Sequence, residues 1–225
     1  MTFSVVARCK SSGMFGLAIS SSSPAVAARC AFARAGVGAV ASQNITDPSL
    51  GVRALELMQL GASSTQAIEV LKSSSEYVDY RQVLAVDSDG RTAIHSGQNS
   101  LGVFAEASGD NVVSAGNLLD HKQVPDTMVE CFENTPGHLG DRLIASLQAG
   151  LAAGGEAGPV HSAGLLVVDR VSWPVAELRC DWLEDGCPIE NIATAWTVYR
   201  PQLQDYLQRA HNPTAAPSYG VPGEE

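Results

Sequence analysis

Strands and helices come in groups along this chain, and several of the strands are apolar on both faces. The alternation begins at once, because Phe3, Val5 and Ala7 share one face of the first predicted strand and Val6 adds an apolar residue to the other. The run LLVV at residues 165–168 has no polar face, which is typical of a strand covered on both sides. This grouping favours two stacked sheets with helices outside them.

The element order follows from periodicity and from local start and stop signals. Asp47 and Pro48 predict a helix start, Ser63 and Gln66 form a capping box, and Pro201 should break or kink the last helix. The predicted strands lie at 2–8, 15–20, 25–33, 36–42, 81–87, 91–97, 111–115, 165–168 and 175–182. Pairs of helices are predicted at 49–73 and 125–151, and a last helix from 188 onward. We expect one domain over residues 1–210 and a flexible tail over 211–225, which is rich in proline and glycine.

Composition narrows the class of protein. The 225 residues are 45% hydrophobic and 17% charged, as expected of a globular chain. A net charge of −10 argues against binding to nucleic acid or to an anionic membrane surface. We expect a cytoplasmic protein, because the sequence has no signal-peptide pattern and no apolar run of the roughly 20 residues that span a bilayer. Five scattered cysteines suit reduced thiols.

Several common catalytic motifs are missing from the sequence. It contains no G-x-S-x-G elbow, no phosphate-binding G-x-x-x-x-G-K-[ST] loop and no H-E-x-x-H. The five histidines are widely separated, so we expect no metal and no organic cofactor. Cys9, beside Lys10, is a nucleophile in principle, but an isolated cysteine at a turn is more often inert.

Thr2 has two interpretations. As a β-branched residue, it suits the strand that it begins. Alternatively, Met1 is removed, and the free α-amine of Thr2 becomes the base for its own hydroxyl. A hydrogen-bonded strand end would hold the two groups in place.

Eight segments resemble the DUF1028 family, whose function is unassigned and which is placed among the Ntn-hydrolase-like (N-terminal nucleophile) folds. The segments are TFSVVAR (2–8), ARAGVGAVASQ (33–43), GVRALELMQLG (51–61), HSG (95–97), AGNLL (115–119), AGLAAGG (149–155), HSAGLLVV (161–168) and LRCD (178–181). The resemblance implies an α+β fold, a four-layer αββα sandwich. By analogy of fold, it also implies hydrolysis of a carbon–nitrogen bond and assembly as a homo-oligomer.

The resemblance also implies roles for individual residues. Thr2 matches the family's expected nucleophile, and Gln43 and Asn117 match polar positions at strand ends that are expected to face the pocket. Asn117 would stabilise an oxyanion or, equally well, cap its strand. Gln43 would act in catalysis or merely satisfy backbone groups.

Three further residues are candidates for substrate binding. His95 and Asp181 lie in matching segments, and each also suits a structural polar role. Ser22 is a departure from the family, because many members carry a basic residue there and related threonine hydrolases use a lysine to keep the amine of the nucleophile deprotonated. Arg29 or Arg34 would have to supply that charge from another strand, or the site works differently.

Two functions follow from these observations. The first is a hydrolase that opens a small amide, imide or related C–N bond through an acyl-Thr2 intermediate, with a small-molecule substrate. The second is a non-catalytic ligand-binding or assembly protein that retains the fold, which the serine at position 22 favours.

Overall fold

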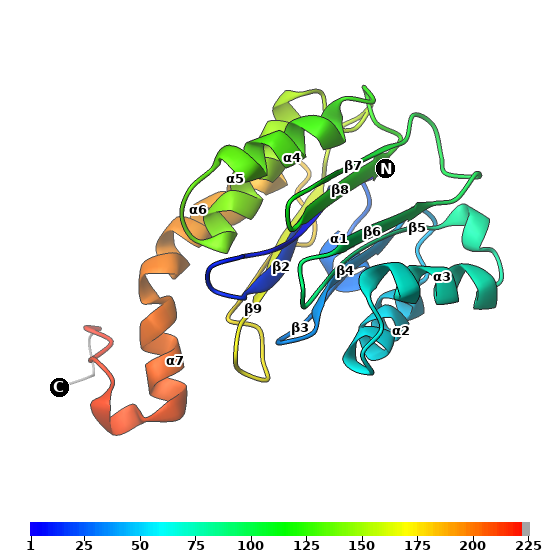
Figure 1. Ribbon diagram of the computed structural model, residues 1–225. Helices are drawn as coiled ribbons and strands as arrows, with labels where there is room; N and C mark the ends of the chain where they lie inside the picture. The colour runs from blue at the N-terminus through cyan, green and yellow to red at the C-terminus, as the bar shows by residue number, and fades with distance from the viewer. Residues whose placement is uncertain (222–225) are drawn as a thin grey trace.

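Two antiparallel sheets run through the computed structural model, which describes residues 1–221 (Figure 1). The six-stranded sheet has the order β10-β9-β2-β1-β8-β7 and the four-stranded sheet the order β3-β4-β5-β6. Their bounds are β1 (Thr2–Arg8), β2 (Phe15–Ser21), β3 (Ala31–Arg34), β4 (Gly38–Gln43), β5 (Gln82–Asp87), β6 (Thr92–Ser96), β7 (Ala105–Gly109), β8 (Val112–Asn117), β9 (Ser162–Val168) and β10 (Ala176–Cys180). The first strand of the chain is therefore a central strand of the larger sheet.

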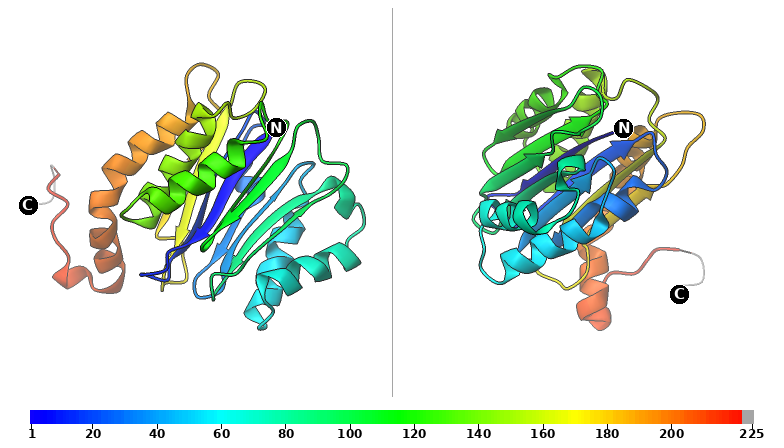
Figure 2. Two further views of the ribbon diagram at one scale, coloured as in Figure 1. Left: turned by 45° about the horizontal axis from the view of Figure 1, so that its top comes forward. Right: turned by 90° about the vertical axis from the view of Figure 1, so that its right-hand side faces the viewer.

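Helices cover the outer faces of both sheets (Figure 2). Helices α4, α5 and α6 pack on the six-stranded sheet, and α2 and α3 pack on the four-stranded sheet. The bounds are α1 (Val26–Cys30), α2 (Pro48–Gln59), α3 (Ser64–Ser74), α4 (Val124–Asn134), α5 (Leu139–Ala152), α6 (Pro188–Tyr199) and α7 (Leu203–His211). None of the helices within residues 1–221 is long and apolar enough to cross a membrane.

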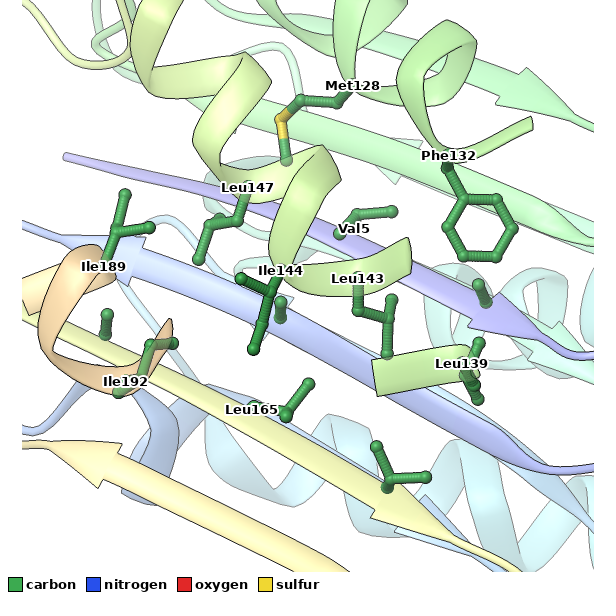
Figure 3. Packing of buried hydrophobic residues seen from close by; sticks show 14 of the residues in the cluster. Val5, Met128, Phe132, Leu139, Leu143, Ile144, Leu147, Leu165, Ile189 and Ile192 are labelled. Carbon is green, nitrogen blue, oxygen red and sulfur yellow. The ribbon is translucent and has the colours of Figure 1, made fainter. Parts of the chain in front are cut away.

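The alternation of β1 divides its side chains between two apolar clusters. Phe3, Val5 and Ala7 join the cluster beneath α4, α5 and α6, where Val5 and Leu143 are fully buried (Figure 3). Val6 joins the cluster between the two sheets. Burying a side chain of this size contributes about 1.5–3 kcal/mol, so both faces of β1 hold the sheet in place. The first predicted strand and the alternation of its side chains between two faces are confirmed.

The local signals at the helix ends are also confirmed. The Asp47 side chain accepts a hydrogen bond from the Ser49 N–H at the start of α2, and Ser63 and Gln66 form the capping box of α3. At Pro201 the helix is interrupted by a 3-10 turn over Arg200–Gln202, after which α7 begins.

Two elements differ from the prediction. The expected strand at 25–33 is wrong, because residues 26–30 form α1 and only the end of the segment enters β3. This short helix packs closely on β9, where a Cβ on Gly164 would lie 2.4 Å from Ala27 Cβ. The second element, β7, was not predicted at all, and its sequence AEASG has little of the β-branched character that marks a strand.

The boundary of the tail stays a prediction. Helix α7 ends at His211, and Pro213–Ala215 form another 3-10 turn. Residues 222–225 of the expected tail lie outside the described residues.

Candidate active site

Polar strand ends meet where β1 begins. Thr2 pairs with Asn117, the last residue of β8, and Ser21 is the last residue of the neighbouring strand β2. Because adjacent strands are antiparallel, the start of one lies beside the ends of its neighbours. Two of the candidate residues from the sequence, Thr2 and Asn117, are therefore brought together by the register of the sheet.

The Thr2 side chain is buried and points at the peptide that precedes it. Its hydroxyl donates to the Met1 carbonyl oxygen and lies 3.3 Å from Ser21 Oγ. The Ser21 hydroxyl donates to the same carbonyl oxygen. The Met1–Thr2 peptide is thus held by two hydroxyl groups.

A pocket of about 160 Å³ opens over Thr2. Its wall includes Arg29, Cys30, Asn44 and Asn117. This volume suits a small molecule or one group of a larger one.

Of the two arginines that were candidates to replace the missing basic residue, only Arg29 lines this pocket. One of its guanidinium nitrogens donates to the Pro24 carbonyl at 2.9 Å. Arg34 lies at the far end of β3, where it binds Gln59 and lines a separate hollow beside Trp173.

Strained backbone surrounds the pocket. Asn44, Ile45 and Leu118 have φ values of 55°, 40° and 51°. A positive φ is unusual for a leucine and a clear outlier for a β-branched isoleucine. Asn44 stabilises this segment, because its side chain donates to the Tyr80 carbonyl at 2.6 Å and accepts from the Leu101 N–H at 3.1 Å. Strain of this kind clusters at binding and catalytic sites.

A buried polar network joins the two sheets beneath the pocket. Gln43 accepts from the Ser4 hydroxyl at 2.7 Å and donates to Gln82 Oε1 at 2.7 Å. Asn117 donates to the same Gln82 oxygen at 3.3 Å. Gln43 is fully buried and does not line the pocket, so its catalytic role stays a prediction and its contacts are those of a residue that fixes the sheets. Gln82 was not singled out from the sequence.

Glu156 is the other residue that the sequence did not reveal. This residue is only 4% exposed, and its Oε2 accepts a hydrogen bond from the Ser22 N–H at 3.0 Å. Burial raises the pKa of Glu156 to about 7, although the α-amino group, the contacts with Ser22 and the nearby His161 favour its charged form. It lies in the small-residue segment GLAAGGEAG, where nothing but its charge marks it.

The remaining candidates do not line the pocket of Thr2. His95 on β6 has Nε2 3.0 Å from the Val78 carbonyl oxygen. Asp181 pairs with Arg179 at 2.8 Å and is exposed. Ser22 does contact Glu156, but none of these three residues lines the pocket, and their role in substrate binding stays a prediction.

The family model of DUF1028, a family of unknown function, matches residues 2–192. The chain belongs to the DUF1028 family. Its structure is similar to the crystal structure of the DUF1028 protein SPO2555 from Silicibacter pomeroyi, with a TM-score of 0.82 and 25% sequence identity over 88% of each chain. The predicted family is therefore confirmed.

More distant structures are also similar. Anbu (ancestral beta-subunit) from Yersinia bercovieri has a TM-score of 0.36 and 12% identity, over 92% of this chain and 97% of that one. An Anbu (Gly-1) mutant from Hyphomicrobium sp. strain MC1 has a TM-score of 0.41 and 12% identity, over 92% of this chain and 100% of that one. No curated protein matches the chain.

Proposed function

We propose that this DUF1028 protein hydrolyses a small amide, imide or related C–N bond with Thr2 as an N-terminal nucleophile. In this proposal the two sheets and their outer helices form the four-layer αββα sandwich of the Ntn-hydrolases. The observation that carries the proposal is the position of Thr2, which begins a central strand and lines a small polar pocket.

The chemistry requires Met1 to be removed. The Thr2 hydroxyl then attacks the carbonyl carbon of the substrate, and the α-amine on the same residue takes up the hydroxyl proton. The ammonium returns this proton to the substrate nitrogen as the C–N bond breaks, which leaves an acyl-Thr2 ester. Water then hydrolyses the ester to a carboxylic acid and the free Thr2 hydroxyl.

Asn117 is the proposed oxyanion donor. It lines the pocket beside Thr2, its partner on the neighbouring strand, and it is only 2% exposed. A side-chain amide carries two N–H donors, so the bond to Gln82 leaves one for the oxyanion. Such a donor is typically worth about 3 kcal/mol in the transition state.

Intact-mass measurement of the purified protein tests the first requirement. We expect the mass to be short by one methionine, because threonine is small enough for the preceding methionine to be trimmed. Thr2→Leu is the matched control, since its larger side chain should keep Met1 attached. Complete retention of Met1 in the wild-type protein would contradict the mechanism, because the Thr2 nitrogen would remain in a peptide bond.

The second candidate function is ligand binding or assembly without catalysis. One observation favours it: the Met1 carbonyl accepts two hydrogen bonds, and the Met1 side chain packs near Gly158, 3.2 Å from where a Cβ on that glycine would lie. If Met1 stays in place, it occupies part of the pocket wall. A screen of small amides and imides separates the two functions, because a binding protein would retain its ligands without turning them over.

We also propose a small-molecule substrate, a cytoplasmic location and a homo-oligomer. The pocket of about 160 Å³ fits such a substrate. Sedimentation analysis of the purified protein measures the oligomeric state, and a single monomeric species would contradict that part of the proposal.

A further inference from the structure

The segment that carries Glu156 continues the line of β1 beyond its first residue. Thr2 pairs with Asn117 on β8, and Glu156 forms an antiparallel bridge with Leu119, two residues further along the chain. The bridge is flanked by backbone hydrogen bonds of 3.0 Å from Asp120 N to the Gly155 oxygen and from Ala157 N to the Leu118 oxygen. Residues 155–157 thus take the place beside the end of β8 that a longer β1 would occupy. The start of β1 therefore faces Glu156.

The carboxyl group of Glu156 is buried and only half satisfied. Oε2 accepts from the Ser22 N–H at 3.0 Å, whereas Oε1 has no hydrogen-bond partner within residues 1–221. A buried carboxylate is costly unless it is paired. An unpaired oxygen at the start of β1 indicates a site for a positive group.

Two ionisable groups within residues 1–221 influence the charge of this carboxyl. The α-amino group of Met1 and the side chain of His161, just before β9, both interact with it electrostatically. From helix α1, Arg29 and Cys30 line the pocket of Thr2, and both Arg29 and the α-amino group influence the Cys30 thiol. The α-amino group of Met1 is thus close to Glu156 on one side and to helix α1 on the other.

We propose that Glu156 is a positioning residue for the nucleophile: once Met1 is removed, its carboxylate binds the α-amino group of Thr2 and stabilises the ammonium form. This inference rests on the proposed function and deepens it. In the attack, the Thr2 O–H bond breaks and an Oγ–carbon bond forms. The proton goes to the amine, and the electron pair of the carbonyl π bond goes to the oxygen. Glu156 stabilises the ammonium until it returns that proton to the leaving nitrogen as the C–N bond breaks.

This role would account for the serine at position 22. A lysine there would keep the amine deprotonated before the attack. The backbone N–H of Ser22 instead fixes a carboxylate that stabilises the amine after it has gained the proton. The consequence is an amine that becomes free at a higher pH than it would without Glu156.

The pKa of the Thr2 amine in the processed protein tests the assignment. Intact mass first establishes that Met1 is absent. The rate of acetylation of Thr2 by acetic anhydride is then followed against pH by mass spectrometry of the N-terminal peptide, with the exposed Lys10 as reference within the same sample. The comparison includes wild type, Glu156→Gln, Glu156→Asp and the control Glu130→Gln, which removes the same charge from an exposed position on α4.

We expect Glu156→Gln to lower the pKa of the amine by about one unit, so that acetylation at a fixed pH below both pKa values becomes about tenfold faster. Glu156→Asp withdraws the carboxylate by one methylene group and should fall between Gln and wild type. Glu130→Gln should match wild type. Equal pKa values in wild type and both Glu156 variants would overturn the role of Glu156 alone, whereas retention of Met1 in the wild-type protein would overturn the proposed function as well.

Discussion

Two buried carboxyl groups lie at opposite ends of this fold, and their surroundings differ. Asp87 ends β5, far from the Thr2 pocket, and accepts hydrogen bonds from the N–H groups of Ser64, Asp89 and Arg91 and from the Arg91 guanidinium, all within 3.0 Å. Glu156 lies beside the start of β1, and its Oε1 has no partner within the described residues. At one end of the fold both carboxyl oxygens of Asp87 accept hydrogen bonds. At the other end one carboxyl oxygen of Glu156 accepts none within the described residues.

The pKa shifts of the two acids have opposite directions. At Asp87, burial alone would raise the pKa, but the hydrogen bonds from Ser64, Arg91 and Asp89 outweigh burial and lower it. At Glu156, burial prevails and raises the pKa to about 7. Burial therefore does not identify a functional acid; the number of hydrogen-bond donors around the acid distinguishes the two.

The largest expected effect is on catalytic turnover, and it compares Thr2, at the start of β1, with Cys9, which follows the end of β1. Thr2→Val keeps the shape of the side chain and removes the hydroxyl, so turnover of any amide found in a screen should fall by about a thousandfold or more. Cys9→Ala, at the other end, should leave turnover within about a factor of two. The rates are measured with the same substrate in both variants.

The reason for testing Cys9 is its thiol. Burial by itself raises the pKa of Cys9, but hydrogen bonds with Ser11 and Ser12 outweigh this and lower it to about 7. The side chain nevertheless packs in the apolar cluster beneath α4 and α5 rather than in the Thr2 pocket. If Cys9→Ala lost most of its turnover while Thr2→Val stayed active, the nucleophile would be Cys9 and not Thr2.

The second prediction compares the two acids through stability. Asp87→Asn removes the charge that the surrounding N–H donors bind and turns an amide N–H₂ toward some of them, so the free energy of unfolding should fall by about 2–3 kcal/mol. In the Thr2→Leu background, where Met1 stays attached and Glu156 Oε1 has no partner within the described residues, Glu156→Gln should leave it unchanged or raise it, because it removes an unpaired buried acid. Urea denaturation at pH 7 measures both.

Asp89→Asn is the matched control for the first of these variants. It lies two residues from Asp87, and its side chain is 66% exposed and pairs with Arg91. Its effect should be small, as for other exposed ion pairs. If Asp89→Asn lowered the free energy of unfolding as much as Asp87→Asn, the loss could not be assigned to the hydrogen bonds of the buried Asp87 carboxylate.

The first two strands and the helix caps of this fold could be predicted from the sequence, since they depend on neighbours in the chain. Asn117 was a candidate through the family resemblance alone, and its pairing with Thr2 is a contact between distant segments that the sequence did not predict. Glu156 could not be placed, because its approach to Thr2 depends on the bridge to Leu119, a contact between distant segments. Helix α1 was missed for a similar reason, since its close packing on Gly164 of β9 is a long-range contact.

The third prediction concerns the pH dependence of stability. Because the pKa of Asp87 is lower in the folded protein than the ordinary aspartate value of 3.8, the unfolded chain takes up its proton first as the pH falls. The contribution of Asp87 to stability is therefore complete above that value and is lost as the pH falls below it toward the folded pKa. The free energy of unfolding, measured by urea between pH 5 and pH 3, should fall less steeply in Asp87→Asn than in wild type. Parallel curves would contradict the assigned shift.

The smallest effect is expected at the turn after β1, where Lys10 and Asp110 form an ion pair of 2.9 Å. Their side chains are 73% and 67% exposed, so water and salt screen the attraction and little is lost when the pair is broken. Lys10→Ala should therefore leave the urea midpoint unchanged within the error of measurement, in low and in high salt. A salt-dependent loss of stability would mean that the end of the fold away from Thr2 depends on its surface charges, and not only on the buried contacts of Asp87.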